Sequence, residues 1–223
     1  ALENHTTGSD NIAVGKNVAN ALTTGNTNIA IGGQAMNTNT VGDRNVAIGY
    51  SALETYNPAS NEDSYNVAVG FAALEADTTG KNNTAIGGNA LLVNTTGGNN
   101  TAVGTSALLA NTTASSNTAV GKSAASAITT GTGNVAVGAQ ALESTTTSNG
   151  NTALGYISLH SNTTGATNTA VGQEALQKNT TANFNVAVGY QALEENTTGA
   201  NNTAIGTNAL DDNTTASNNT AVG

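Results

Sequence analysis

Residues 104–120 read Gly-Thr-Ser-Ala-Leu-Leu-Ala-Asn-Thr-Thr-Ala-Ser-Ser-Asn-Thr-Ala-Val, and Gly121 then starts the same pattern again. The closing motif of this unit, Asn-x-Ala-aliphatic-Gly, occurs thirteen times along the chain. Eleven of its twelve intervals are 17 residues long, and the remaining one is 21 residues long. A fixed short period of this kind predicts a solenoid, in which each unit stacks on the next. The motif closes at Gly15, Gly32, Gly49, Gly70, Gly87, Gly104, Gly121, Gly138, Gly155, Gly172, Gly189, Gly206 and Gly223.

Each motif reads as a short β-strand that ends at its glycine. The middle residue is alanine in every copy, and its two neighbours are Thr, Val or Ile before it and Val, Ile or Leu after it. β-branched residues favour strands, and the exact repeat predicts parallel pairing in register. Side chains alternate along a strand, so alanine lies on one face and the aliphatic residues lie on the other. Since an exposed position would accept polar residues, the unvarying alanine predicts a face buried against neighbouring chains, and therefore an obligate oligomer.

The rest of the unit supplies a second wall and the turns. An Ala-Leu pair follows the glycine by three and four places, as in Ala107-Leu108, and predicts the other apolar wall of a thin coil. An asparagine precedes every strand, and asparagine suits turns because it tolerates left-handed backbone and bonds to its own chain. Stacked in register, these identical asparagines are expected to form a hydrogen-bonded ladder.

Composition excludes several classes of function. The formal net charge is −9 with only five basic residues, which disfavours binding to nucleic acid and to anionic membranes. No apolar run approaches the roughly 20 residues of a membrane-spanning helix, so no membrane insertion is expected. Leu, Ile, Val and Phe number 39, about 17% of the chain. The hydrophobic stabilisation from one coil is therefore small, and the fold must sum it over many stacked coils. The chain begins and ends within a repeat, which indicates a fragment of a longer fibre forming a single repeat domain, 1–223.

The chain contains few side chains suited to catalysis, and the sequence predicts that it is not an enzyme. His5 and His160 are the only histidines, cysteine is absent, and the 14 acidic residues do not recur with the spacing of metal ligands. We therefore expect no catalytic residue, metal or cofactor. The rival interpretation is a solenoid enzyme that acts on polysaccharides, but such an enzyme needs basic and acidic residues clustered in a groove.

The 21-residue interval supplies the first candidate contact residues. It places Glu62 and Asp63 between Tyr56 and Tyr65, on what should be a surface loop. Tyrosines on such a loop are suited to receptor contact. The alternative, a tolerated insertion without a role, is equally open.

Two further candidates directly follow repeat glycines. Tyr50 and Phe71 occupy this position on successive coils, where stacking would bring them together. The same position accepts Lys16 and Lys122, so we expect it to be exposed. Protein or carbohydrate contact is one interpretation of these aromatic residues, and simple surface packing is the other.

Threonine also recurs, eight places after the glycine, in eleven of the twelve intervals. A row of threonines on a β-solenoid is one feature of ice-binding proteins. Those proteins need two outward threonines separated by an inward residue, whereas here the paired threonines are adjacent and should point in opposite directions. Ice binding is therefore a minor alternative.

Segments such as Asn117-Thr-Ala-Val-Gly121 and Asn185-Val-Ala-Val-Gly189, the second followed by the pair Ala192-Leu193, resemble the head repeats of trimeric autotransporter adhesins of the YadA type. They are also similar to repeat regions of phage tail-fibre proteins. The resemblance implies an all-β fold, a homotrimeric left-handed parallel β-roll. The adhesin heads usually have somewhat shorter units, so the stacked 17-residue coils predicted here are a departure from the family. The resemblance also implies an extracellular position, at a cell or virion surface, and a role in reach and attachment to a protein or glycan receptor. The alternative is a tail-fibre shaft that recognises a phage host.

Overall fold

The computed structural model describes all 223 residues as short strands joined by turns, without a helix. It divides into two compact units, Ala1–Ala114 and Ser115–Gly223, each built from the same repeat. The first unit contains β1 (Ile12–Val14), β2 (Ile29–Ile31), β3 (Val46–Ile48), β4 (Val67–Val69), β5 (Thr84–Ile86) and β6 (Thr101–Val103). The second contains β7 (Thr118–Val120), β8 (Val135–Val137), β9 (Thr152–Leu154), β10 (Thr169–Val171), β11 (Val186–Val188), β12 (Thr203–Ile205) and β13 (Thr220–Val222).

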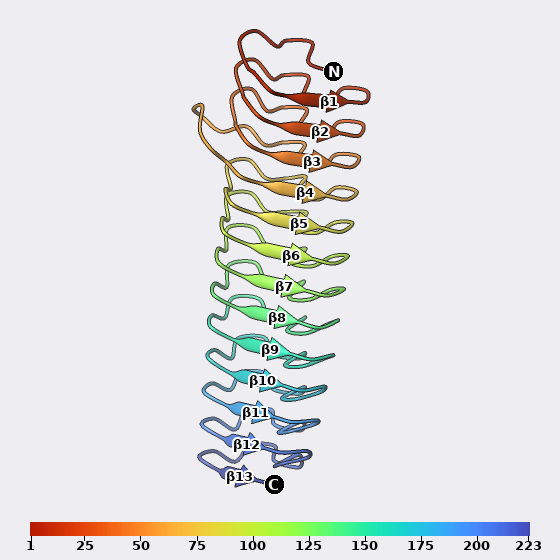
Figure 1. Cartoon of the computed structure of the whole chain (residues 1–223). Helices are drawn as coiled ribbons and strands as arrows, with labels where there is room; N and C mark the ends of the chain where they lie inside the picture. Colours follow the sequence, from red (N-terminus) through yellow and green to blue (C-terminus); the bar gives the residue numbers. More distant parts are fainter. The chain divides into compact units, whose positions relative to one another are not determined.

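Within each unit, every strand pairs in parallel with the strand of the next coil. The motifs align residue for residue, so that Ala13 pairs with Ala30 in the first unit and Ala170 with Ala187 in the second. Figure 1 shows each coil as one strand followed by a return path through turns. Each unit is therefore a parallel β-solenoid, which confirms the predicted all-β class and its in-register stacking. The 21-residue interval leaves the register intact, because Ala47 pairs with Ala68 across it.

The core of each coil is formed by small apolar side chains. The strand alanines from β2 to β12 are fully buried. They lie opposite the Ala-Leu pairs, such as Ala90-Leu91 in the first unit and Ala175-Leu176 in the second, whose side chains are also fully buried. The predicted second wall is thus confirmed. A coil this thin has room for alanine at the strand and for one leucine facing it, which explains why no larger residue replaces the alanine.

This core corrects the interpretation of the unvarying alanine. The alanine face is closed by the chain's own coil, and no neighbouring chain is needed to cover it. The face left open is the opposite one, formed by the first residue of each strand, which is Thr, Val or Ile, and by the third residue. The third residue is aliphatic in all thirteen strands, and Ile31, Ile86, Leu154 and Ile205 are 36 to 42% exposed. An exposed position should accept polar residues, yet this outward position is aliphatic in every strand. The case for a neighbouring chain that covers the strands therefore rests on the outward row and not on the alanine.

Buried asparagines form the predicted ladder along each unit. The Asn134 side-chain oxygen accepts hydrogen bonds from the Asn151 backbone N–H (3.0 Å) and from the Asn151 side-chain amide (3.3 Å). The same Asn151 amide donates to the Gly165 carbonyl at 2.9 Å. Asn151 Oδ1 in turn accepts from the Asn168 backbone N–H at 2.9 Å. One fully buried side chain thereby satisfies two backbone groups of the following coil and bonds the asparagine of the preceding one, which accounts for its presence in every repeat. A second, unpredicted ladder runs through the turns, where the Asn179 amide donates to the Asn162 side-chain oxygen at 2.9 Å.

Candidate functional site

Two of the predicted contact residues, Tyr50 and Phe71, come together on the first unit. Each directly follows a repeat glycine, and in-register stacking places them on neighbouring coils despite the longer interval between them. Their rings are stacked with centroids 5.9 Å apart and planes inclined by 10°. Both rings are more than half exposed. Offset stacking of this kind stabilises the pair and fixes the direction in which each ring faces.

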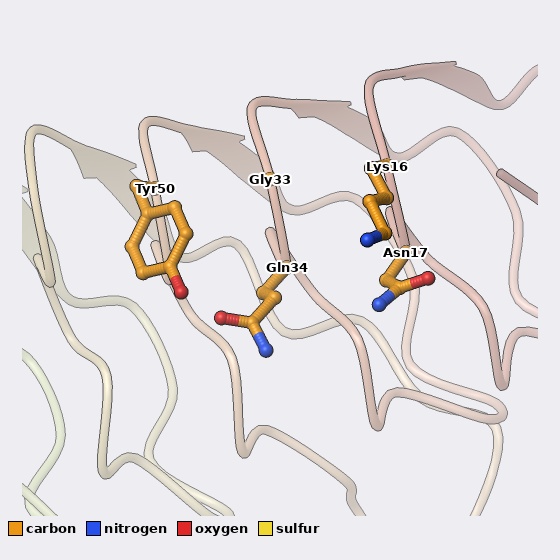
Figure 2. A pocket seen from close by; sticks show the side chains of 5 residues that line it. All are labelled: Lys16, Asn17, Gly33, Gln34 and Tyr50. Atoms are coloured by element: carbon orange, nitrogen blue, oxygen red, sulfur yellow. The ribbon is translucent and has the colours of Figure 1, made fainter.

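A depression of about 260 Å³ adjoins this aromatic pair on the side of the preceding coils. We refer to it as the Gly33 depression, and it is lined by Lys16, Asn17, Gly33, Gln34 and Tyr50 (Figure 2). It exists because Gly33 has no side chain. A β-carbon built at Gly33 would lie 3.2 Å from Cδ2 and 3.5 Å from Cε2 of Tyr50. The edge of the Tyr50 ring therefore occupies space that a side chain at this position would need.

Sequence reasoning identified Tyr50 but missed the polar half of this site. The sequence predicts that the position after the repeat glycine is exposed. Lys16 supports that prediction, but the sequence assigns it no binding role. The available signal was the order of residues in that row, because Gly33 separates Lys16 from Tyr50 and leaves a gap between them. Gln34 comes from the next position along its coil, and its Oε1 accepts a long hydrogen bond from Ser51 Oγ (3.5 Å).

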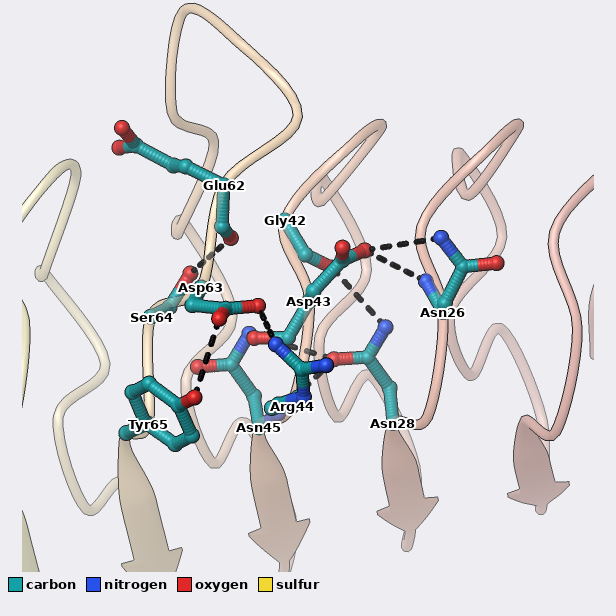
Figure 3. A network of polar contacts seen from close by, with 10 residues as sticks. All are labelled: Asn26, Asn28, Gly42, Asp43, Arg44, Asn45, Glu62, Asp63, Ser64 and Tyr65. Atoms are coloured by element: carbon teal, nitrogen blue, oxygen red, sulfur yellow. Dashed lines mark hydrogen bonds and ion pairs between the residues drawn. The ribbon is translucent and has the colours of Figure 1, made fainter.

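A second group of side chains lies near the start of the strands of the first unit (Figure 3). Arg44 forms an ion pair with Asp63, and Tyr65 Oη donates a hydrogen bond to Asp63 Oδ2 at 3.0 Å. The Arg44 guanidinium lies 5.7 Å from the centroid of the Tyr65 ring. We refer to Arg44, Asp63 and Tyr65 as the arginine cluster. Exposed ion pairs contribute little to stability, so the cluster presents an ordered surface more than it holds the fold together.

Glu62 lies on the same loop but has a different partner. Its Oε2 pairs with the Lys81 ammonium at 2.7 Å. The backbone on both sides of it is fixed to the preceding coil, because Asp43 N–H donates to the Glu62 carbonyl at 3.1 Å and Ser64 N–H donates to the Asp43 carbonyl at 3.2 Å. The inserted loop thus carries Glu62 and Asp63 on a framework bonded to its neighbours.

Tyr56 was predicted to be a contact residue, and this prediction is wrong. Its side chain is fully buried. Counted from Gly49 it is the seventh residue, the same inward row that holds Asn39 and Asp77 in the neighbouring coils, and this count could have placed it inside. A β-carbon on Gly42 would lie 2.9 Å from Tyr56 Cε1, so the ring packs directly against that glycine. Burial raises the pKa of the Tyr56 phenol to about 12.

The row of threonines is used within the solenoid. The hydroxyl of Thr95 donates to the Thr112 carbonyl at 3.0 Å, and that of Thr163 donates to the Thr180 carbonyl at 3.0 Å. Each hydroxyl thus caps a backbone group of the next coil. A hydroxyl bonded in this way is not presented to a lattice of water molecules, which weighs against the ice-binding alternative.

Other polar groups are dispersed. His160 Nε2 lies 2.9 Å from Glu143 Oε2 on the preceding coil, and no third titratable side chain joins them in a metal-binding group. No three His, Cys, Asp or Glu side chains of the chain come together as candidate metal ligands. The structure also contains no helix long and apolar enough to cross a membrane.

Comparison with known proteins adds no relative. No protein-family model, no curated protein and no solved structure matches this chain. The functional interpretation therefore rests on the repeat, on the surfaces that the fold presents, and on the resemblance of the motif.

Proposed function

We propose that the chain is a non-enzymatic segment of an extracellular fibre in which three copies assemble and attach to a surface. The observation that carries this proposal is the outward aliphatic row. It is aliphatic in every strand and about two-fifths exposed at Ile86 and Ile205 when one chain is considered alone. Contiguous exposed apolar surface of this kind marks a site of association. The number three and the left-handed β-roll come from the resemblance to the adhesin head repeats.

The solenoid suits a structural role in such a fibre. Parallel coils stack at about 4.8 Å each, so every added repeat lengthens the segment without a change of fold. The ladders of buried asparagine bind each coil to the next with hydrogen bonds that do not depend on a large core. An adhesin at a cell surface and a tail fibre on a virion both need this kind of extended support.

Attachment is assigned to the surfaces that interrupt the repeat. The Tyr50–Phe71 pair with the Gly33 depression is one, and the arginine cluster with Glu62 is the other. Both present half-exposed aromatic rings beside charged or amide groups, which is the composition favoured at contact sites. The contact residues proposed are therefore Tyr50, Phe71, Glu62, Asp63 and Tyr65.

An attachment assay tests this function. Beads coated with the chain should be retained on bacterial cells, animal cells or mucin-coated glass more than beads coated with albumin. A double variant, Phe71→Thr with Tyr65→Asn, should lose most of that retention. Both replacements occur at the same positions of other coils, as Thr105 and Asn99, so the fold should tolerate them.

The matched control is Phe184→Asn, which removes an exposed ring at the position equivalent to Tyr65 in the second unit. It should keep full retention, because no arginine cluster surrounds it. Retention on none of the three surfaces, or equal retention by the parent and the double variant, would contradict the proposed attachment surfaces.

A further inference from the structure

The Gly33 depression has the features of a binding site for a small polar ligand. We propose that it binds one acidic sugar residue, such as a uronic acid carried by a surface glycan. This inference rests on the proposed attachment function and names the chemistry of one of its two surfaces. It depends on three observations: an exposed aromatic face, an unpaired cation, and amide groups in the same depression.

The aromatic face is supplied by Tyr50. Phe71 stacks with this ring from the following coil, and the Cδ2–Cε2 edge of the Tyr50 ring lies towards Gly33 on the preceding coil. Because Gly33 has no side chain, this edge rests against the preceding coil, and a broad face of the ring is turned to the open side of the depression (Figure 2). The C–H groups on the flat face of a sugar ring are slightly positive and pack well on the negative face of an aromatic ring. Phe71 would hold the Tyr50 ring in the orientation that this packing requires.

The cation is supplied by Lys16, one coil beyond Gly33. Three of the five basic residues are already neutralised, since Arg44, Lys81 and Lys178 each pair with a carboxylate. Lys16 forms no ion pair and lines the depression. Lys16 and Tyr50 each follow a repeat glycine, two coils apart, so their backbones are separated by about 10 Å. A single sugar ring stacked on Tyr50 can place a carboxylate towards the Lys16 ammonium across this distance.

Amide groups complete the lining. Gln34 lies between the coils of Lys16 and Tyr50, Asn17 lies beside Lys16 (Figure 2), and an amide can both donate to and accept from sugar hydroxyls. The volume of about 260 Å³ is smaller than the roughly 300–1,000 Å³ of pockets for drug-sized ligands, which fits one sugar ring. A long polyanion is disfavoured by the net charge of −9, and an apolar ligand would strand the amides without partners.

The chain contains its own comparison for this site. Lys122, Gln140 and Tyr156 repeat the arrangement of Lys16, Gln34 and Tyr50 in the second unit, with Ala139 in the place of Gly33. There, however, the Gln140 amide donates to Glu143 Oε2 at 2.9 Å, and Ala139 adds a methyl group at the position of Gly33. The Glu143 carboxylate beside Gln140 would repel the carboxylate of an acidic sugar. We therefore expect one sugar site per chain, and Gly33→Ala should convert it towards the inactive arrangement.

Saturation-transfer NMR on the full chain tests the inference, with galacturonic acid, glucuronic acid, the neutral sugar methyl galactoside, and acetate as probes. Ring protons of at least one acidic sugar should receive saturation, and Gly33→Ala or Tyr50→Thr should weaken its binding tenfold or more. Lys16→Gln should reduce the affinity of the acidic sugar to that of the neutral one. The matched control is Gly88→Ala, in the same row, where a β-carbon meets no neighbouring atom and binding should be unchanged.

Each possible failure has a distinct meaning. No saturation of either acidic sugar, or equal binding to Gly33→Ala, would overturn the sugar site. Acetate binding as tightly as the acidic sugars would show an anion site only and would also overturn it. In the bead assay, loss of sugar binding with unchanged retention would refute this site as an attachment surface and leave the arginine cluster as the remaining one. Absence of retention in the parent chain would instead refute the proposed function itself.

Discussion

Replacing Gly138 with alanine is expected to destabilise the second unit by about 3–5 kcal/mol. The Gly138 backbone has φ +137°, a conformation that residues with a side chain rarely adopt. An added β-carbon would also lie 2.3 Å from the Gly155 oxygen and 2.6 Å from the Gly155 carbonyl carbon of the next coil. Both atoms belong to the backbone of a stacked coil, so neither can move without breaking the register. Urea unfolding followed by circular dichroism measures the loss.

Gly133→Asn is the matched control for this substitution in the same unit. Gly133 has φ +65°, and a β-carbon there meets no atom within 4 Å. The equivalent position holds Asn201 with φ 58°, so the asparagine already has a precedent in the repeat. Its effect should be below about 1 kcal/mol. If Gly138→Ala and Gly133→Asn had equal effects, close stacking of the coils at the repeat glycine would not be what excludes side chains there.

Replacing Asp77 with asparagine is expected to stabilise the first unit by about 2–4 kcal/mol above neutral pH. Asp77 is fully buried in the inward row of the second asparagine ladder. Its Oδ1 accepts a hydrogen bond from Gly80 N–H at 2.8 Å, whereas its Oδ2 has no hydrogen-bond partner. In the next coil the corresponding amide of Asn94 donates to the Gly97 carbonyl at 3.0 Å. A charged carboxylate has no hydrogen to offer at that point, and an asparagine has one.

The pKa of Asp77 gives the sign of the pH dependence. Burial raises it from 3.8 to about 7, although the Gly80 N–H and the amides of Asn94 and Asn83 act in the opposite direction. Because the folded-state pKa is above the unfolded one, the folded chain binds the proton more tightly between these values. The favourable contribution of neutral Asp77 is therefore fully present below about pH 3.8. It is lost as the pH rises to about 7, and it is absent above that.

Urea unfolding of the parent and of Asp77→Asn between pH 4 and pH 9 measures this dependence. The stability difference between them should be largest at pH 8–9 and should shrink as the pH falls towards 4. Tyr56 on the preceding coil is the nearest titratable neighbour in the row, and its pKa of about 12 keeps it neutral throughout. Asp212→Asn, at an exposed position, should change stability by less than about 0.5 kcal/mol. A constant difference across the range would show that Asp77 does not titrate near neutral pH.

The sequence predicted the architecture well because the repeat supplies its own alignment. Thirteen copies of one motif established the strands, their parallel register and the asparagine ladder before side-chain contacts were known. Which face the alanine occupies could not be settled by the pattern alone, since a buried position is equally invariant whether its own coil or another chain covers it. The structure assigns the alanine to the interior of the coil and leaves the aliphatic row outside.

The backbone between the strands was the least predictable part. Leucines such as Leu108 and Leu176 adopt positive φ angles of 50° and 52°, a conformation that sequence rules reserve for Gly, Asn and Asp. Burial of the leucine side chain and hydrogen bonds to the next coil compensate for the conformational cost of the positive φ angle. Propensity scales do not include this compensation. The Gly33 depression was hard to predict for the same reason, because it forms only when the coils stack. It arises from one missing side chain between Lys16 and Tyr50, which are 34 positions apart in the sequence.

Sedimentation equilibrium of the chain at micromolar concentration measures whether copies of this solenoid associate through the outward aliphatic row. We expect a mass near three times 21.9 kDa for the parent chain. We also expect dissociation of a folded Val171→Lys, Val188→Lys double variant, because both residues are third in their strands, at β10 and β11. A parent chain that stays folded at 21.9 kDa across all concentrations would contradict the assembly on which the proposed fibre depends.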